Sequence, residues 1–355
     1  MGKRGTSGLS LVVGINKPQG MSSHDVVNRC RRIFNERRVG HTGTLDPQAT
    51  GALAICVGPA TRLENYFVGH DKIYQFRVAF GKSTETDDAE GEIIREMPVP
   101  EEVLDKEYAQ KYLQTLVGKH MQMPPVYSAI KVNGKRAYAQ ARAGKVIELQ
   151  PRAIEIYSIK LLGVGTNLND QLPFEKLPGA IDEIPEEDAC YPYWDIEVSV
   201  SKGTYIRSLA RDIGTGMKTC AYVSRLHRVQ AGLLNISQCL SLEALEEIGS
   251  EASLDSVRLL GLPITFVRGE NIEDVNCGRT LSMKERQFFM YRARQSEDCV
   301  CTGSLTEIKK PTVNGDYVAV VADNTLKAIY AYNEKKQGLV PACVFPIGVS
   351  RGTNI

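Results

Sequence analysis

The twelve residues from Gly40 to Gly51 constrain this chain more than any other stretch of its sequence. They read Gly-His-Thr-Gly-Thr-Leu-Asp-Pro-Gln-Ala-Thr-Gly, with three glycines, one proline and a single carboxylate, Asp46. Glycines adopt backbone conformations that other residues avoid, and they let a ligand approach the main chain closely. Pro47 favours an extended conformation at Asp46, so the acid is held on a stiff turn. The stretch is either a glycine-rich connection capped by Asp46 or a loop that carries a functional site.

The pattern of this stretch resembles the catalytic motif of the TruB family of RNA pseudouridine synthases. That motif is Gly-His-x-Gly-x-Leu-Asp-Pro-x-Ala-x-Gly, and the chain fills every fixed position. The aspartate is essential in the family, so the resemblance implies that Asp46 is the catalytic carboxylate. It also implies that His41 helps to hold a flipped-out nucleotide and that Gly43 and Thr44 contribute to substrate binding. For His41 the alternative is simple packing within the loop.

Two more blocks of the same family lie beside predicted strands. Residues 17–23, Lys-Pro-Gln-Gly-Met-Ser-Ser, resemble the first family motif, which packs beside the catalytic loop. Lys17 is therefore expected to bind substrate or to support the site, and the alternative is a surface lysine at a turn. Residues 71–74 resemble Asp-Lys-x-Tyr, whose tyrosine stacks on the target base. Tyr74 is expected to hold the base and to assist removal of its C5 proton, and the alternative is ordinary packing in a sheet.

The remaining matches include an arginine and a leucine. Lys-Gly-Thr-Tyr-Ile-Arg at residues 202–207 resembles a family block whose arginine forms an ion pair with the catalytic aspartate and whose tyrosine packs in the site. This implies those roles for Arg207 and Tyr205, because a guanidinium group can grip a carboxylate at two points. For Arg207 the alternative is a salt bridge on a helix surface. Leu226 matches the leucine of a Leu-Arg-Arg segment that packs in the active site. His227 replaces the first arginine there, which puts in doubt any RNA contact of that position.

Periodicity predicts a mixture of strands and helices along the first 260 residues. Buried or half-buried strands are expected at 11–15, 52–57, 71–80, 147–164 and 194–201. Helices are expected at 24–35, after Pro59, at 106–117 and from 207 to about Ile213, the last one stopped by Gly214 and Gly216.

Residues 165–193 interrupt this pattern. They are rich in Asp, Glu, Pro and Gly and lack periodicity, which predicts an exposed acidic loop. Acid near an RNA site would repel phosphate, so this insertion is expected to lie away from the substrate.

The length of 355 residues is enough for two or three domains. The resemblance covers about residues 10–160 and 194–245, and it implies an α+β fold with a central mixed, largely antiparallel sheet. The expected domains are 1–260, the pseudouridine synthase catalytic domain, and 261–355, a small C-terminal β domain that is PUA-like. Short strands are expected near 278–279, 299–305, 318–321, 326–332 and 339–345. Whether that domain docks on RNA or only packs on the first domain is left open.

Charge is distributed unevenly although the net charge is only +1. Residues 1–65 carry nine Lys and Arg against four Asp and Glu, and residues 201–232 carry six against one. Residues 162–200 carry one against nine. If the two basic blocks meet in space, they form a patch that attracts phosphate backbones, and the alternative is ordinary solvated surface.

Several classes of protein are disfavoured by composition. Nine scattered cysteines without a Cys-x-x-Cys pair, and five dispersed histidines, predict neither a disulfide framework nor a zinc site. No apolar run approaches the length of a membrane span, and no secretory signal is visible, so a cytoplasmic protein is expected.

The resemblance implies a stand-alone enzyme that isomerises uridine to pseudouridine at position 55, in the T loop of tRNA. The expected partner is the T-arm stem-loop, with no cofactor, no metal, no membrane and no obligate protein partner, and the protein is expected to be a monomer. Asp46 could attack the ribose, deprotonate it, or add to the uracil ring. The alternatives are a tRNA-folding chaperone, a guide-RNA-dependent pseudouridine synthase subunit, and a nucleoside hydrolase, which the lack of a second carboxylate in residues 40–51 disfavours.

Overall fold

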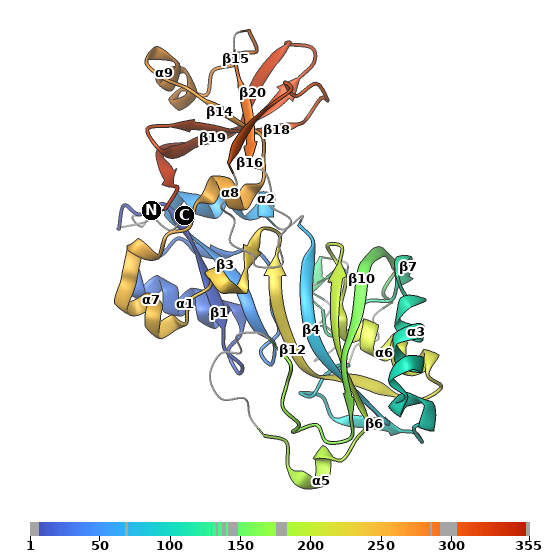
Figure 1. The fold of residues 1–355 in the computed structure, drawn as a ribbon. Coiled ribbons are helices and arrows are strands. Elements are labelled where there is room, and N and C mark those ends of the chain that lie inside the picture. Colours follow the sequence, from blue (N-terminus) through green and yellow to red (C-terminus); the bar gives the residue numbers. More distant parts are fainter. Residues whose placement is uncertain are drawn as a thin grey trace.

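The computed structural model contains two β-sheets with helices packed around and between them (Figure 1). It describes residues 7–67, 70–128, 130–132, 134–136, 140, 148–174, 183–284, 286–291 and 304–352. The second sheet stands at one end of the first, and helix α5 lies at the other end (Figure 1). None of the helices in these residues has the length and hydrophobicity needed to cross a membrane.

The first sheet is mixed and largely antiparallel, as predicted. Its strands run in the order β1-β3-β12-β4-β11-β10-β7, with β2 paired to β3 and β13 paired to β12. Among the strand pairs of this sheet in the described residues, only β3 and β12 are parallel. The strands are β1 Leu11–Lys17, β2 Val39–His41, β3 Thr50–Val57, β4 Lys72–Phe80, β7 Gly118–Gln122, β10 Arg152–Gly165, β11 Tyr193–Val200, β12 Ala221–Ala231 and β13 Leu234–Asn235. The predicted start of β10 at Ile147 lies outside the described residues.

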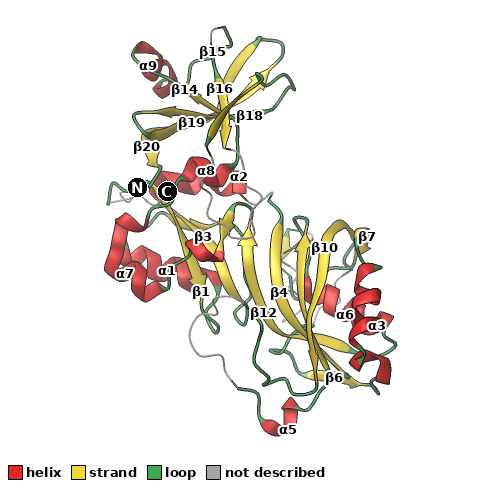
Figure 2. Cartoon of the chain, viewed as in Figure 1, coloured by secondary structure: helices red, strands yellow, loops and turns green. Residues whose placement is uncertain are grey.

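Helices cover the first sheet in two groups (Figure 2). Helices α1 (Ser23–Ile33) and α7 (Leu242–Ile248) pack on β1 and β3, whose inward side chains include Val13 and Ile55. Helices α3 (Lys106–Gln114) and α6 (Ile206–Gly216) pack on β4, β11 and β10 around the buried Trp194. The segment after Pro59 forms a 3-10 helix, Gly58–Leu63, that leads into α2, Glu64–Phe67.

Strand β4 is buried along most of its length, which corrects the half-buried strand expected from its alternation. One face of the strand packs in the apolar core, and the side chains of the other face are buried as well. Its polar residues are buried with partners on β11. Gln75 donates to Glu197 at 2.8 Å, and Arg77 forms two 2.8 Å bonds to Asp195. The alternation therefore identified the apolar and the polar face of β4 correctly, but it did not reveal that the polar face is buried as well.

Helix α6 continues through Gly214, where the sequence predicted that it stops. A Cβ atom at that position would lie 2.6 Å from the backbone nitrogen of Ala221, on β12. The glycine is thus required by the close approach of helix and strand rather than by a helix end.

The second sheet has seven strands in the order β15-β20-β19-β18-β14-β16-β17. Three predicted strands are confirmed, as β18 Tyr317–Ala322, β19 Thr325–Asn333 and β20 Gly338–Ser350. Positions 278–279 form a turn after helix α9 (Glu270–Asn276), and most of the strand expected at 299–305 lies outside the described residues. The other strands are β14 Ile264–Phe266, β15 Leu281–Ser282, β16 Phe288–Tyr291 and β17 Leu305–Ile308.

A hydrophobic core is shared between the two sheets. It contains Val12 and Cys56 from the first sheet, Ile329 and Phe345 from the second, and Val257 from the short helix α8 (Ser256–Leu260). Helices α8 and α2 lie between the sheets (Figure 1).

Two short hairpins and one further helix are the remaining strands and α-helices of the described residues. Strands β5 (Lys82–Thr84) and β6 (Ile93–Glu96) flank residues 85–92, and β8 (Lys131–Val132) pairs with β9 (Lys135–Arg136). Helix α5 (Glu186–Ala189) belongs to the acidic insertion.

Candidate active site

Asp46 and Arg207 form an ion pair at the centre of the site. Nε of Arg207 lies 3.0 Å from Oδ2 of Asp46, and the two side chains are 7% and 33% exposed. The carboxylate therefore remains open to a ligand while the guanidinium group is enclosed. Arg207 lies in the first turn of α6, so the helix backbone fixes the position from which its side chain extends.

Arg207 is held by three further contacts. Its Nη1 lies 3.2 Å from Oδ2 of Asp88 and donates to the carbonyl oxygen of Thr86 at 2.9 Å. Its Nη2 donates to the carbonyl oxygen of Tyr127 at 2.8 Å. Since a guanidinium group is planar, these contacts set the direction of the Nε–H that faces Asp46.

Asp88 is a site residue that the sequence motifs did not reveal. Burial raises the pKa of this carboxyl, and the Thr86 hydroxyl and Arg207 act in the opposite direction. Its Oδ1 accepts from the backbone N–H of Glu90 at 3.1 Å. Arg207 itself could have indicated a second acidic partner, because a buried guanidinium group has more donors than one carboxylate can accept.

The segment that carries Asp46, residues 40–51 (the Asp46 loop), is fastened to helix α1. The Ser23 hydroxyl donates to the carbonyl oxygen of Leu45 at 2.9 Å and accepts from the backbone N–H of Leu45 at 2.8 Å. Gly20 donates to the carbonyl oxygen of Pro47 at 3.0 Å. The residues on both sides of Asp46 are therefore fixed by the turn and first helical residue that follow β1.

Lys17 is fully buried below the Asp46 loop. Its ammonium group donates to the carbonyl oxygens of Pro18 (2.8 Å), Met21 (2.6 Å) and Pro47 (3.0 Å). Burial lowers its pKa to about 8, with Asp46 opposing the shift. This geometry fits the supporting role that the sequence allowed for Lys17 and leaves the ammonium group out of reach of a substrate.

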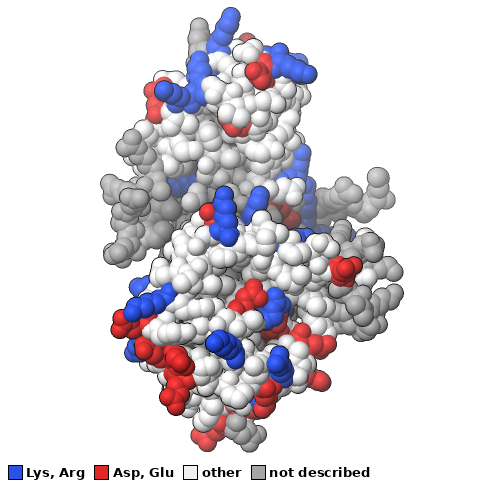
Figure 3. Space-filling model, turned by 90° about the vertical axis from the view of Figure 1, so that its right-hand side faces the viewer, with Lys and Arg blue, Asp and Glu red and all other residues white. Residues whose placement is uncertain are grey.

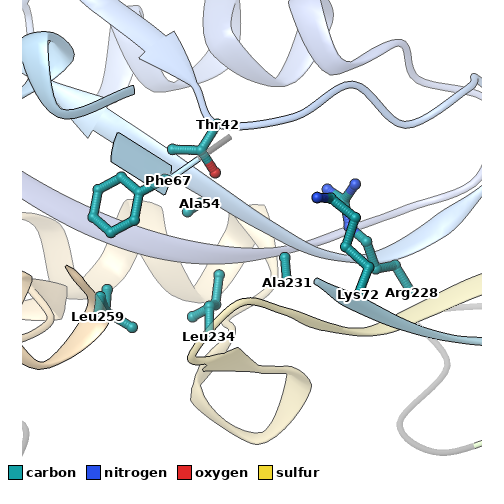
Figure 4. A pocket seen from close by; sticks show the side chains of 8 residues that line it. All are labelled: Thr42, Ala54, Phe67, Lys72, Arg228, Ala231, Leu234 and Leu259. Carbon is teal, nitrogen blue, oxygen red and sulfur yellow. The ribbon is translucent and has the colours of Figure 1, made fainter. Parts of the chain in front are cut away.

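Arg228 fastens the loop from the other side. It is buried on β12 and donates through Nε to Ala52 at 2.7 Å, through Nη1 to Thr44 at 3.4 Å and through Nη2 to Gly43 at 3.1 Å, in each case to the carbonyl oxygen. Figure 4 shows Arg228 beside Lys72 at one end of a cavity of about 10 Å³. That volume holds about one water molecule, so this cavity is too small for a substrate.

The remaining predicted residues of the loop lie close to these contacts. His41 ends β2, and its Nδ1 accepts from the backbone N–H of Gly43 at 3.3 Å. Burial lowers the pKa of His41, and the charge of Arg228 lowers it further, so the ring is neutral at pH 7. Thr44 is exposed, and its side chain is available to a ligand.

Tyr74 and Leu226 are buried in the same apolar cluster, which also includes Leu45 of the Asp46 loop. The site thus has an apolar side formed by β4 and β12 next to the ion pair. Tyr205 precedes α6 and exchanges two bonds with the side chain of Gln122, at 2.9 and 3.0 Å. Burial raises the pKa of the Tyr205 hydroxyl.

His227 is buried, with its Nδ1 2.8 Å from the hydroxyl of Thr50. His227 stands where the family has an arginine, and the sequence put in doubt any RNA contact of that position. In this chain it lies inside the sheet between β12 and β3 instead.

The face of the molecule drawn in Figure 3 shows no single basic patch over the first sheet. Lys and Arg stand out around the second sheet at the top of Figure 3, whereas acidic and basic groups are mixed over the first sheet below. Lys17, Arg207 and Arg228 belong to the two basic blocks of the sequence, and all three are buried around the Asp46 loop. Among the described residues, no group of three or more His, Cys, Asp or Glu side chains is placed to hold a metal ion.

Comparison with known proteins gives consistent matches. Residues 31–206 match the family described as TruB family pseudouridylate synthase (N terminal domain). The tRNA pseudouridine synthase B of Streptococcus mutans is 34% identical over 284 residues, which are 79% of this chain and 90% of that protein. The same enzyme of Deinococcus deserti is 40% identical over 255 residues, 69% of this chain and 82% of that protein.

Solved structures with the same fold include the chain matched in the crystal structure of a Cbf5-Nop10-Gar1 complex. It is 19% identical, with a TM-score of 0.60, and covers 97% of this chain and 86% of that chain. The chain matched in an H/ACA RNP bound to a substrate RNA containing 2′-deoxyuridine gives a TM-score of 0.59 at 19% identity, over 96% of this chain and 86% of that one.

Proposed function

The chain belongs to the TruB family of pseudouridylate synthases, and we propose that it converts uridine to pseudouridine at position 55, in the T loop of tRNA, with Asp46 as the catalytic carboxylate. The observation that carries the proposal is the ion pair of Asp46 with Arg207 at 3.0 Å. The residues on both sides of Asp46 are held in place by hydrogen bonds. The curated relatives, named tRNA pseudouridine synthase B, support tRNA as the substrate. The protein is expected to act as a monomer without an obligate protein partner.

The reaction rearranges one nucleotide without changing its composition. The bond between N1 of uracil and C1′ of ribose breaks, the base turns, and C5 is joined to C1′. C5 then loses a proton and N1 gains one. Asp46 is the nucleophile at C1′, as carboxylates are in retaining glycosidases, or it deprotonates the ribose or adds to the ring. In each case the carboxylate must be directed at one atom, which is what the Arg207 contact does.

The apolar side of the site suits a planar base. Tyr74 and Leu226 lie in one cluster beside the loop, and Tyr74 is placed on the strand next to β12. A uridine in a folded RNA has to leave its stack to reach Asp46. Tyr74 then holds the base and assists removal of the C5 proton, while the neutral ring of His41 supports the flipped nucleotide. Gly43 and Thr44, on the loop, and Tyr205, before α6, complete the substrate contacts.

The test uses a T-arm hairpin with 5-tritiated uridine, incubated with the wild-type protein and with Asp46→Asn. The wild type should release tritium and leave pseudouridine at position 55. Asp46→Asn keeps the size of the side chain and should bind the hairpin with nearly the same affinity but release no tritium. Tight binding by the wild type without release would contradict the proposal and leave a chaperone or a guide-RNA-dependent subunit. Free uracil among the products would indicate a hydrolase.

A further inference from the structure

The acidic insertion, residues 166–192, is attached to the first sheet at both of its ends. Nη1 of the buried Arg77, on β4, donates to the carbonyl oxygens of Leu168 at 2.8 Å and Asp170 at 3.0 Å. Leu168 donates to the carbonyl oxygen of Ala189 at 2.8 Å, and both residues are 1% exposed. A buried guanidinium group needs acceptors for its donors, and the backbone of the insertion supplies two of them. The ends of the insertion are therefore buried, which corrects the exposed loop that the sequence predicted.

The β5–β6 hairpin, residues 82–96, needs support from outside. A two-stranded hairpin is marginally stable by itself, and this one has three paired positions with a register shift between Ser83 and Thr84. All residues of β6 are exposed. The hairpin is held to β12, where Val223 donates to the carbonyl oxygen of Asp87 at 3.1 Å.

The insertion supplies a second attachment. Nζ of the buried Lys82 lies 3.2 Å from Oδ1 of Asp188, on α5, and 4.3 Å from the centre of the Tyr191 ring. Burial acts to lower the pKa of Lys82, but Tyr191 and Asp188 outweigh it and the pKa is raised, so the group is an ammonium ion at pH 7. Beside this contact, a cavity of about 480 Å³ separates the two segments. The contacts of Lys82 therefore carry the attachment.

A short series of contacts leads from Lys82 to the ion pair of the site. Lys82 and Thr84 are both buried on β5, with the less buried Ser83 between them, as alternate residues on one face of a strand are. The Thr84 hydroxyl donates to the carbonyl oxygen of Asp88 at 2.6 Å. The carboxylate of Asp88 lies 3.2 Å from Nη1 of Arg207. The position of β5 thus determines where Asp88 meets the guanidinium group that faces Asp46.

We propose that the insertion fixes the β5–β6 hairpin through Lys82, and that Lys82 is thereby a positioning residue for the reaction at Asp46. The inference rests on the proposed function. Loss of the attachment displaces Asp88 and turns the guanidinium group away from its best direction. A misdirected catalytic group slows the chemical step, while the surface that binds RNA is unchanged.

The experiment measures the single-turnover rate of the full-length protein on T-arm RNA, together with its affinity for that RNA. Lys82→Met keeps the buried stem without the charge and should lower the rate roughly tenfold, with affinity unchanged. Lys82→Arg keeps the charge and should stay within about twofold of the wild type. Asp188→Asn should lower the rate only about fivefold, because a half-exposed ion pair contributes little more.

Glu186→Gln is the matched control. Glu186 is an exposed acid on the same helix as Asp188, so this change removes the same charge from the insertion without touching Lys82. Its rate should stay within about twofold of the wild type. An effect of the insertion on RNA through charge alone would instead change Glu186→Gln and Asp188→Asn by the same factor.

A double variant tests the route through Asp88. If Lys82 acts through that carboxylate, Lys82→Met should cost less than about twofold when Asp88→Asn is already present, because coupled residues are not additive. Two losses that multiply in full would overturn this route.

Amide hydrogen exchange tests the attachment without any need for catalysis. Peptides from residues 82–96 should exchange faster in Lys82→Met than in the wild type, since local opening becomes easier. Peptides from β1 and β3 should be unchanged, and a melting curve of each variant checks that the fold is retained.

The outcomes separate this inference from the function on which it rests. If the wild type modifies no T-arm RNA, the proposed function fails, and the exchange experiment still decides whether Lys82 holds the hairpin. If the wild type is active and Lys82→Met has the same rate, or loses affinity instead of rate, Lys82 is not a positioning residue. Unchanged exchange of residues 82–96 would overturn the attachment itself.

Discussion

At the scale of single residues, the buried carboxylate of Asp88 lies 3.2 Å from Nη1 of Arg207 and so controls where Nε faces Asp46. Asp88→Asn keeps the size of this side chain but removes its charge. We expect kcat/KM to fall about 100-fold, since a displacement of a positioned group by about 1 Å has that effect, while affinity for the hairpin stays close to that of the wild type. Single-turnover kinetics and a binding titration measure the two quantities.

Asp87→Asn is the control for that prediction. Asp87 is bound to Arg211 at 2.8 Å rather than to Arg207. Its φ of 60° is left-handed, and asparagine accepts this conformation as readily as aspartate does. We expect less than a fewfold loss of kcat/KM from Asp87→Asn. Equal losses in the two variants would mean that Asp88 has no particular part in positioning Arg207.

The lowered pKa of Lys17 predicts that the stability of the protein depends on pH in the alkaline range. Its pKa is lowered from 10.5 to about 8 by burial. Between these two values the folded protein binds fewer protons at Lys17 than the unfolded chain. Hence the free energy of unfolding should rise with pH in this window, by up to about 3 kcal/mol. Below pH 8 both states are charged and the cost of burial is fully present.

Activity should change in the opposite direction over the same window. A neutral amine has one donor fewer than the ammonium group, so one of its three carbonyl contacts is lost and the Asp46 loop loosens. We expect kcat/KM to fall above about pH 8 while stability rises, as measured by turnover and urea unfolding across that range. Lys17→Met should abolish this fall of kcat/KM at alkaline pH. Lys72, whose pKa is also about 8, donates to His70 instead of to the loop. Lys72→Met should therefore retain the fall of kcat/KM at alkaline pH. If the fall disappeared in Lys72→Met, the assignment to Lys17 would be refuted.

The sequence predicted the residues of the site that belong to contiguous motifs. Asp46 and Arg207 each lie in a distinctive run, and the ion pair expected between them is present. The contacts of Asp88 and Arg228 could not be predicted in this way, because they depend on which carbonyl and carboxylate groups the folded chain brings to a buried guanidinium group. The catalytic and binding roles of the predicted residues stay predictions.

At the scale of elements, two neighbouring serines at the start of α1 have different partners. Ser22 is the N-cap, with its hydroxyl accepting from the backbone N–H of Asp25 at 3.1 Å. The Ser23 hydroxyl is bound to both backbone groups of Leu45 instead. Both serines stand directly before the helix predicted at 24–35, where capping residues are common. A capping pattern cannot show that the second hydroxyl faces a distant loop.

Alanine substitutions should separate these two functions. Ser22→Ala should cost about 1 kcal/mol of stability, as the loss of an N-cap does, with kcat unchanged. Ser23→Ala leaves two buried backbone groups without their partner, which costs about 1–3 kcal/mol, and it frees the residue before Asp46. We expect kcat to fall roughly tenfold or more. Urea unfolding and single-turnover rates test the pair, and a loss of kcat in Ser22→Ala alone would reverse the assignment.

At the scale of the whole molecule, one hydrophobic core extends across the domain boundary that the sequence predicted at residue 260. Val12 and Cys56, on the first sheet, pack in one cluster with Ile329 and Phe345 of the second. Backbone bonds add to this junction, since Ser350 donates to the carbonyl oxygen of Ser10 at 2.8 Å. The sequence predicted the two sets of strands but not this contact. Apolar residues on both faces of β1 and β3 do not tell which element covers each face.

The shared core predicts that the two sheets unfold together. Calorimetry of the full chain should show one cooperative transition, because unfolding of either sheet exposes the apolar surface of the other. Phe345→Ala, in the shared core, should cost about 3–5 kcal/mol and lower the temperature of that single transition. Phe288→Ala, in the cluster confined to the second sheet, should lower the same transition without splitting it. Two separate transitions, with Phe288→Ala moving only one of them, would instead show that residues 1–260 fold independently and that the junction contributes little to their stability.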